Sequence, residues 1–143
     1  MLEAVAKVNP NVVVVLSGGA PIEAPWLDSC KAVVHGYLGG QAGAGAVVDV
    51  LTGKVNPSGK LAETWAMKYE DTPAYRYFPG TEATAEYREG LYIGYRYYQT
   101  AQVPVRFPFG YGLSYTTFAY ADLRASDKEV TFTITNTGRV AGA

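Results

Sequence analysis

The sequence predicts an α/β layer followed by a tyrosine-rich connector and the first strands of a β-sandwich. Three observations lead to this fold class. Residues 12–16 form a continuous apolar run that ends in Ser-Gly-Gly, which is typical of a parallel strand buried on both faces. Eight of the 12 tyrosines crowd into residues 69–98. Apolar residues alternate with threonines over residues 130–135, the pattern of a half-buried antiparallel strand.

The first part of the chain alternates helical and strand patterns. Apolar residues at helical spacing over residues 2–8 precede an Asn-Pro pair, so we expect the last turns of a helix that starts before this chain does. The run at 12–16 is predicted to be a central strand. After a proline-containing loop we expect a short helical turn over residues 26–31 and a second strand over residues 32–37.

A helix and a short strand are expected next. Within residues 41–52 the apolar side chains share a helical face, and Gly53 stands where a left-handed C-terminal cap belongs. Residues 56–59, Asn-Pro-Ser-Gly, have turn chemistry. Residues 61–65 are predicted to form a short edge strand. The order strand, turn, strand, helix indicates an α/β layer.

Beyond residue 67 the pattern changes. Residues from 68 to about 105 have no stable period and are rich in Tyr, Gly and Pro, too apolar for a disordered linker and too long for an ordinary loop. They are expected to form an ordered connector that packs across neighbouring domains. Residues 118–123 are a plausible partner for the strand near 130–135, but two strands cannot bury a sandwich face.

These patterns divide the chain into three parts. We expect the C-terminal part of an α/β sandwich domain over residues 1–67, the ordered connector over residues 68–115, and a β-sandwich domain cut short over residues 116–143.

Composition excludes several classes of function. The 143 residues carry 12 Lys and Arg against 13 Asp and Glu, so no basic field exists to hold a nucleic-acid backbone or an anionic membrane surface. The longest apolar run is far shorter than the ~20 residues of a membrane helix, and the first residues lack the regions of a signal peptide. We therefore expect a soluble chain with neither nucleic-acid nor membrane partners, and the sequence leaves its compartment open.

Several short motifs have weak functional interpretations. The glycine-rich residues 39–45 follow a strand and open a helix, so they could bind a phosphate, but neither a dinucleotide fingerprint nor a P-loop ending is present. Ser17 lacks the nucleophile-elbow pattern. His35 is the only histidine, too few for a zinc site or a triad. Cys30, the only cysteine, has no activating neighbours. We expect turn and packing roles for all of these residues, and no cofactor or metal.

Glu86 and Glu89 are the weak candidates for catalysis. They lie among tyrosines in the segment Ala-Glu-Tyr-Arg-Glu-Gly, and retaining glycoside hydrolysis needs two carboxyl groups about 5.5 Å apart. The alternative is an ion-pair network with the nearby Arg88 and Arg96 that holds the connector in place. The tyrosines could stack on sugar rings or on one another.

Together these landmarks resemble glycoside hydrolase family 3 along nearly the whole chain. The segments that carry the resemblance are NVVVVLSGGAPIEAPWL (11–27), YLGGQAGAGAVVDVLTGKVNPSGKL (37–61), YREGLYIGYRYY (87–98), FPFGYGLSY (107–115) and TNTGRVAG (135–142). The run DTPAYRYFPGT (71–81) adds a similarity to members in which the sandwich domain precedes the barrel. The resemblance implies part of a flavodoxin-like α/β sandwich layer, followed by the connector and the start of a fibronectin-III-like domain.

The resemblance also implies a retaining enzyme that removes sugars from β-linked glucosides or xylosides, with a β-glucoside or oligosaccharide as its substrate. The family's nucleophile is an aspartate on a (β/α)8 barrel, and its acid/base is commonly a glutamate on a loop before the strand expected here at residues 12–16. Neither has a counterpart in this sequence. We therefore assign no catalytic residue and no substrate-binding residue, and we expect the fragment by itself to be inactive.

Two other functions stay open at this stage. One is a non-catalytic carbohydrate-binding or interaction module that uses the tyrosine-rich surface. The other is a nucleotide-binding α/β domain, which rests on the glycine run alone. Because partial domains expose apolar surface and open sheet edges, we also expect the chain to self-associate.

Overall fold

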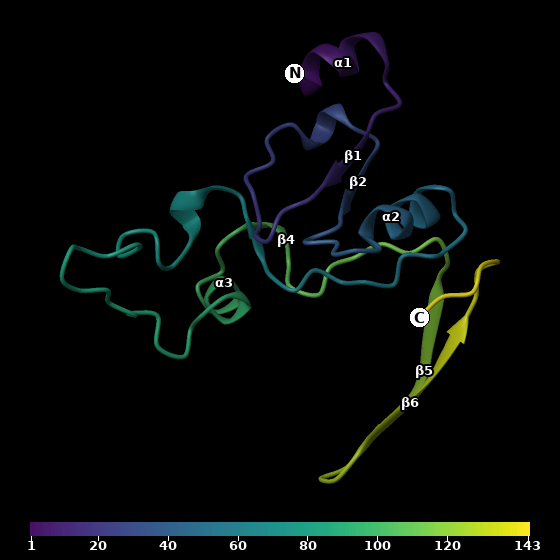
Figure 1. Cartoon of the computed structure of the whole chain (residues 1–143). Coiled ribbons are helices and arrows are strands. Elements are labelled where there is room, and N and C mark those ends of the chain that lie inside the picture. The colour runs from purple at the N-terminus through teal and green to yellow at the C-terminus, as the bar shows by residue number, and fades with distance from the viewer. The chain divides into compact units, whose positions relative to one another are not determined.

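The structure, a computed structural model, describes residues 1–143 (Figure 1). It separates into two compact units, one formed by residues 1–43 and 60–111 and the other by residues 44–59 and 112–143. The helices and strands of the first unit are α1 (Leu2–Val8), β1 (Val13–Leu16), η1 (Leu27–Ser29), β2 (Ala32–His35), β3 (Trp65–Ala66), η2 (Tyr69–Asp71), α3 (Tyr95–Thr100) and β4 (Val105–Phe107). The second unit contains α2 (Gly43–Leu51), β5 (Phe118–Ala125) and β6 (Val130–Asn136). The first residue of α2, Gly43, is assigned to the first unit.

The strands β1 and β2 form a two-stranded parallel sheet, in which Val13 pairs with Ala32 and Leu16 with His35. Both strands and the short helical turn between them, η1, confirm the expected elements, as α1 confirms the helix before them. The expectation that β1 is buried on both faces is wrong. Val13 and Val15 are exposed while Val14 and Leu16 are half-buried, because a sheet of two strands leaves one face without a covering layer.

The helix α2 begins after a tight glycine turn and ends at a left-handed glycine. A Cβ placed on Gly39 would lie 3.0 Å from the Cα of Gly43, so the glycine run allows a close backbone approach where the helix begins. Gly53 has φ +75°, as the C-terminal cap prediction requires.

The strand expected over residues 61–65 is wrong in its position. Leu61 exchanges backbone hydrogen bonds with Gly110 and Tyr111, both at 2.8 Å, but the strand β3 begins only at Trp65 and pairs antiparallel with β4. Trp65 is 2% exposed and is the largest fully buried side chain. Its ring lies 5.3 Å from that of His35 and 5.8 Å from that of Phe107. This aromatic contact joins β2, β3 and β4.

The tyrosine-rich residues contain a helix that the pattern did not predict. The helix α3 starts after Gly94, which has φ +51°, and includes three tyrosines in six residues. Six residues are too few to establish a helical period, and tyrosine has only a modest helix propensity. Between η2 and α3 the chain runs as a long loop with no helix or strand (Figure 1).

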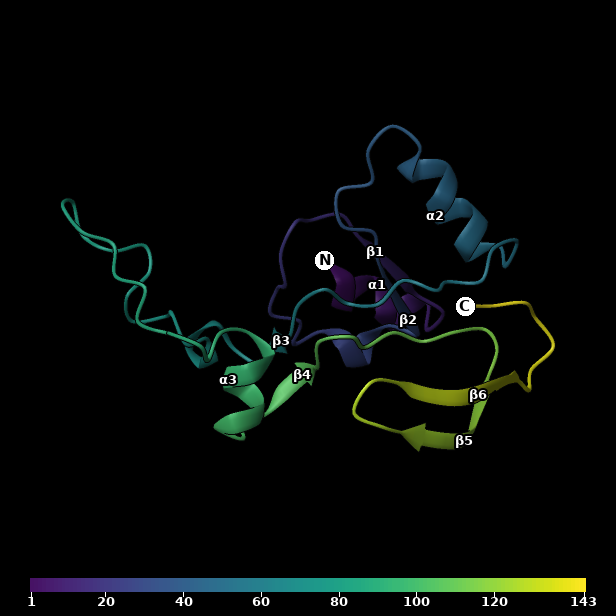
Figure 2. The same cartoon turned by 90° about the horizontal axis from the view of Figure 1, so that it is seen from below.

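In the second unit the antiparallel pairing of β5 with β6 is confirmed (Figure 2). The register shifts between Ala121 and Arg124, where Asp122 has φ +56°. The expected half-buried face is wrong for this hairpin, since every residue of β6 is exposed. The reason is that two strands supply no opposing sheet.

Asn56 connects three segments of this second unit. Its Oδ1 accepts hydrogen bonds from the Tyr115 amide at 2.7 Å and from the Ser114 hydroxyl at 3.2 Å. Its Nδ2 donates to the Ala141 carbonyl at 3.2 Å. The Tyr115 hydroxyl also donates to the Val50 carbonyl at the end of α2, at 2.9 Å. Side-chain hydrogen bonds thus hold this unit together where apolar burial is scarce.

Candidate functional site

A cavity of about 550 Å³ lies in the first unit. Its walls come from the loop after β1, from β3 and the residues beside it, from η2, and from α3 with the turn before it. We call it the tyrosine cavity after Tyr69, Tyr95 and Tyr98, which line it. Its volume lies within the range of about 300–1,000 Å³ that is usual for small-molecule sites.

The aromatic wall of the tyrosine cavity is built mainly by α3. Tyr95 and Tyr98 are three residues apart and therefore share a helix face. The Tyr95 ring stacks on Phe109, with ring centres 5.0 Å apart and planes at 30°. Tyr98 is only 7% exposed, and it also lines a smaller cavity of about 120 Å³ together with Tyr95 and Thr64. The two hollows thus share Tyr95 and Tyr98 of helix α3.

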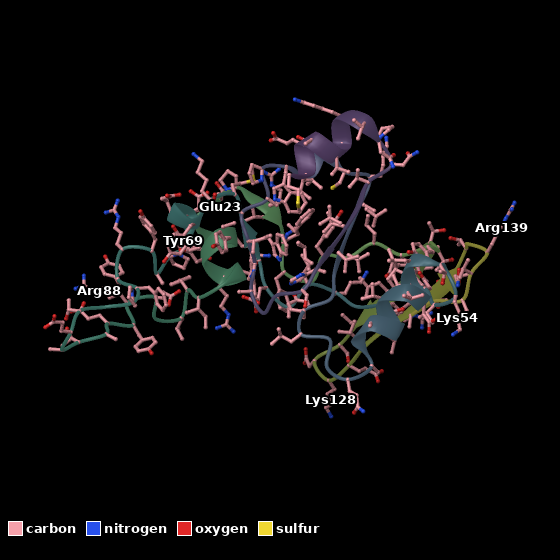
Figure 3. The ribbon with its side chains drawn as sticks, turned by 45° about the horizontal axis from the view of Figure 1, so that its top comes forward. Glu23, Lys54, Tyr69, Arg88, Lys128 and Arg139 are labelled. Carbon is pink, nitrogen blue, oxygen red and sulfur yellow. The ribbon has the colours of Figure 1, made fainter.

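Three carboxylates, Glu23, Glu63 and Glu89, and one ammonium group, Lys68, line the tyrosine cavity. Glu23 lies beside Tyr69 (Figure 3), and its Oε1 accepts a hydrogen bond from the Tyr69 amide at 2.6 Å. This contact fixes the loop after β1 against η2. Glu63 and Glu89 make no ion pair.

Burial and nearby negative charge act on Tyr98. Burial raises the pKa of its hydroxyl, and Tyr97, Asp71 and Glu89 raise it further. The hydroxyl is therefore protonated at neutral pH and available as a hydrogen-bond donor. It makes no hydrogen bond to another residue of the chain.

The two glutamates that the sequence singled out lie in different settings. Glu86 is exposed and forms an ion pair with Arg88. The Arg88 guanidinium also stands over the Tyr77 ring at 4.4 Å, and its hydrogen bond to Glu86 raises the pKa of Arg88. Glu89 is half-buried and lines the tyrosine cavity, which Glu86 does not. Arg96 contacts the Tyr95 ring at 5.9 Å and forms no ion pair with either glutamate.

The other residues named from the sequence occupy structural positions. His35 packs on Tyr37 with ring centres 4.1 Å apart, and both of its ring nitrogens are buried without a hydrogen bond. The Ser17 hydroxyl donates to the Tyr37 carbonyl at 3.3 Å. The Cys30 thiol donates to the Leu27 carbonyl at 3.2 Å.

Sequence reasoning missed the carboxylates Glu23 and Glu63 as cavity residues. One available signal was the position of Glu23 in the loop that follows the carboxyl end of β1, since ligands of open α/β sheets bind outside the carboxyl ends of the strands. No local signal marks Glu63 or α3, because their place at the cavity depends on contacts between distant segments.

The helices of the chain are short. The longest, α2, has nine residues, and no helix reaches the length and hydropathy that a membrane span requires.

Two parallel strands, β1 and β2, with short helices before, between and after them in the chain, place the chain among α/β domains. The family model described as the glycosyl hydrolase family 3 C-terminal domain matches residues 1–115. The chain therefore belongs to glycosyl hydrolase family 3, which confirms the resemblance carried by the sequence motifs.

Known relatives cover the chain almost completely. It is 50% identical over 150 residues to the thermostable β-glucosidase B of Acetivibrio thermocellus, with 99% of this chain and 20% of that protein aligned. It is 46% identical to an exo-α-(1→6)-L-arabinopyranosidase of Bifidobacterium longum, over 100% of this chain and 20% of that protein. The chain spans about a fifth of the length of these curated relatives.

Solved structures give the same match. The GH3 β-glucosidase of Bifidobacterium adolescentis superposes with a TM-score of 0.90 and 46% sequence identity. The superposition covers 96% of this chain and 21% of that one. The similarity therefore extends from the sequence to the fold of the backbone.

Proposed function

We propose that the chain forms part of a retaining glycoside hydrolase that removes terminal sugars from β-linked glucosides or oligosaccharides. The observation that carries this proposal is the alignment of 99% of the chain, at 50% identity, with a protein named as a β-glucosidase. The second relative is named as an arabinopyranosidase, so the sugar preference of the enzyme is left open.

Within such an enzyme we assign this chain a supporting role. Retaining hydrolysis needs a nucleophile and an acid/base about 5.5 Å apart. The ion pair with Arg88 occupies Glu86, and Glu89 is the only one of the two candidates at the tyrosine cavity. These observations favour a role for residues 1–143 in scaffolding and in a domain interface, with the catalytic pair supplied by other parts of the enzyme.

The test is a chromogenic β-glucoside assay on the purified chain, with the full-length Acetivibrio thermocellus relative as positive control. We expect no turnover above buffer from the chain and clear turnover from the relative. Turnover by the chain that is lost in the Glu89→Gln variant and kept in Glu86→Gln would refute the supporting role.

A second candidate is a non-catalytic carbohydrate-binding or interaction module. It is favoured by the exposed aromatic side chains of the loop before α3, of which Tyr87 is 92% exposed. Sugar-dependent chemical-shift changes at residues 87–92 without any turnover would support this module, and unchanged shifts there would exclude it.

We further propose that residues 116–143 begin a fibronectin-III-like domain. The antiparallel β5–β6 hairpin supports this assignment. In the three-part division of the chain expected from the sequence, residues 1–67 then belong to the α/β sandwich domain and residues 68–115 to the connector.

A further inference from the structure

The two small sheets of the first unit meet at an aromatic contact that contains the only histidine of the chain. The β1–β2 and β3–β4 sheets share no strand, so strand pairing does not hold them to each other. Instead the Trp65 ring of β3 lies against the His35 ring at the end of β2, with ring centres 5.3 Å apart and planes at 84°. We call this contact the histidine joint.

A second side-chain contact joins the same two regions. The Ala62 amide donates a hydrogen bond to the Tyr37 hydroxyl at 3.0 Å, and the Tyr37 ring packs on His35 with ring centres 4.1 Å apart. Tyr37 has φ +48°, a left-handed conformation that a bulky residue keeps only where its surroundings impose it. Ring packing and this hydrogen bond thus hold the segment before β3 to the end of β2.

The histidine joint suits a neutral imidazole and not an imidazolium. His35 is half-buried as a whole, but both of its ring nitrogens are covered by protein and neither has a hydrogen-bond partner. A protonated ring carries two N–H donors and a positive charge, and burial of an unpaired charge is strongly unfavourable. Solvation of the protonated ring therefore favours a state in which the joint is open.

The charged groups around the joint do not remove this penalty. The Glu63 carboxylate raises the pKa of His35, but burial lowers it by more. Glu63 is exposed and makes no hydrogen bond to the imidazole. On β4 the charged residue is Arg106, a cation, which cannot stabilise a second positive charge. On β1, His35 pairs with the uncharged Leu16.

We propose that the histidine joint opens in acid: when the imidazole takes up a proton, Trp65 and residues 62–64 separate from the end of β2. Each sheet keeps its own strand pairing, so the opening is local and precedes global unfolding. The segment that moves also lines the tyrosine cavity, so the shape of that cavity changes with pH. The joint consists of residues of this chain alone and does not depend on the proposed function.

The direction of the pH dependence follows from the two states of the imidazole. In the open joint the ring is solvated and has its ordinary pKa of 6.5, whereas burial lowers the pKa in the closed joint. The open state therefore binds the proton more tightly, and its population rises as the pH falls through 6.5 toward the closed-state pKa.

The experiment follows Trp65 in a Trp26→Phe background, which leaves it as the only tryptophan, between pH 8.0 and pH 5.0. We expect its emission maximum to move to longer wavelength with a midpoint below pH 6.5. The indole N–H of Trp65, buried without a hydrogen-bond partner, should lose protection against exchange over the same range. The Gly36 amide, which donates to the Leu16 carbonyl at 2.9 Å, should keep its protection.

Two variants assign the response to the imidazole. His35→Phe keeps a ring beside Trp65 but takes up no proton, so the emission shift should disappear. Glu63→Gln removes the charge that favours the imidazolium, so the midpoint should move to lower pH. Glu82→Gln changes an exposed carboxylate outside the joint and is the matched control, which should leave the midpoint where it is.

Several results would overturn the proposal. One is an emission shift that persists in His35→Phe, and another is a midpoint at or above pH 6.5, as an imidazolium held by the ring faces would give. Loss of Gly36 protection together with that of Trp65 would show global unfolding instead of a local opening. Because Glu63 is exposed, Glu63→Gln is expected to fold even where His35→Phe does not, and a midpoint that it fails to lower also refutes the proposal.

Discussion

The imidazole of His35 packs among aromatic rings, and this packing changes its pKa. It lies between the rings of Tyr37 and Trp65, and neither nitrogen has a hydrogen-bond partner. The sequence predicted a packing role for this residue, and its ring contacts at the end of β2 agree with it. Burial lowers the pKa of His35 from its ordinary value of 6.5, and Glu63 offsets part of this effect.

This lowered pKa predicts a pH dependence of stability. The unfolded chain takes up the His35 proton near pH 6.5, and the folded chain takes it up only at lower pH. The free energy of unfolding is therefore fully retained above pH 6.5 and falls as the pH drops toward the folded-state pKa. In His35→Phe this part of the decline should disappear.

The measurement compares thermal unfolding of the two proteins at pH 7.5 and pH 5.0. Because carboxylates titrate in both proteins, the difference between them isolates the imidazole. As an independent check, the only histidine should titrate with a midpoint below 6.5 by NMR. An equal loss of Tm in both proteins, or a midpoint at or above 6.5, would contradict the prediction.

Asn56 links distant segments of the second unit through its side-chain hydrogen bonds. The Asn-Pro-Ser-Gly segment was expected to form a turn, but nothing in it revealed that the Asn56 amide would hold residues 114, 115 and 141. Those contacts join positions far apart in the sequence, and a local pattern holds no information about them.

We expect Asn56→Ala to destabilise the second unit by about 1–2 kcal/mol, since it removes hydrogen bonds to the Tyr115 amide and the Ala141 carbonyl, and both of these exposed groups then bond to water. Urea unfolding followed by a probe on the β5–β6 hairpin measures the loss. Asn9→Ala is the matched control, because Asn9 Oδ1 accepts a single local hydrogen bond from the Asn11 amide at 2.9 Å. Equal effects of the two substitutions would argue against a special role for Asn56.

At the scale of elements, the two helices differ in how well the sequence predicted them. Helix α2 lies where the helical spacing of apolar residues predicted a helix, whereas α3 lies where the apolar residues show no helical spacing. The difference is physical. Residues 43–51 give two turns of consistent spacing, whereas the six residues of α3 are fixed by the burial of Tyr98 and by the stacking of Tyr95 on Phe109. Tertiary contacts thus decided the conformation of the shorter helix.

Two glycines, one within α2 and one just after its end, predict opposite responses to the same substitution. Gly45 lies within the helix with nothing within 4 Å of an added Cβ, so Gly45→Ala should stabilise by about 0.5–1 kcal/mol. Gly53 has φ +75°, so Gly53→Ala should destabilise by about 1–2 kcal/mol. Circular dichroism during urea unfolding compares them, and a stabilising Gly53→Ala would show that this cap is not left-handed in solution.

At the scale of the whole molecule, the chain exposes apolar side chains on elements that have few covering partners. On the β5–β6 hairpin, Tyr120, Phe132 and Ile134 are all exposed. Both edges of the two-stranded β1–β2 sheet carry backbone groups with no further strand to pair with. Surfaces of this kind favour association with other chains.

We therefore predict that the purified chain forms dimers or larger oligomers whose population rises with concentration. Light scattering after size exclusion should give a mass above the 15.4 kDa of one chain. The double variant Phe132→Thr and Ile134→Thr should lower that mass, while Thr131→Ser should not. A monomeric mass for the parent chain at high concentration would disprove the prediction.

The sequence by itself determined the family, the order of the main strands and helices, and the left-handed position at Gly53, because motifs, local periodicity and backbone sterics are properties of neighbouring residues. Only the tertiary structure decided the position of β3, the formation of α3, the exposed faces of β1 and of the hairpin, and the tyrosine cavity. Each of these depends on contacts between segments that are distant in the sequence. The burial of a side chain is set by those contacts, so no single stretch of chain can reveal it.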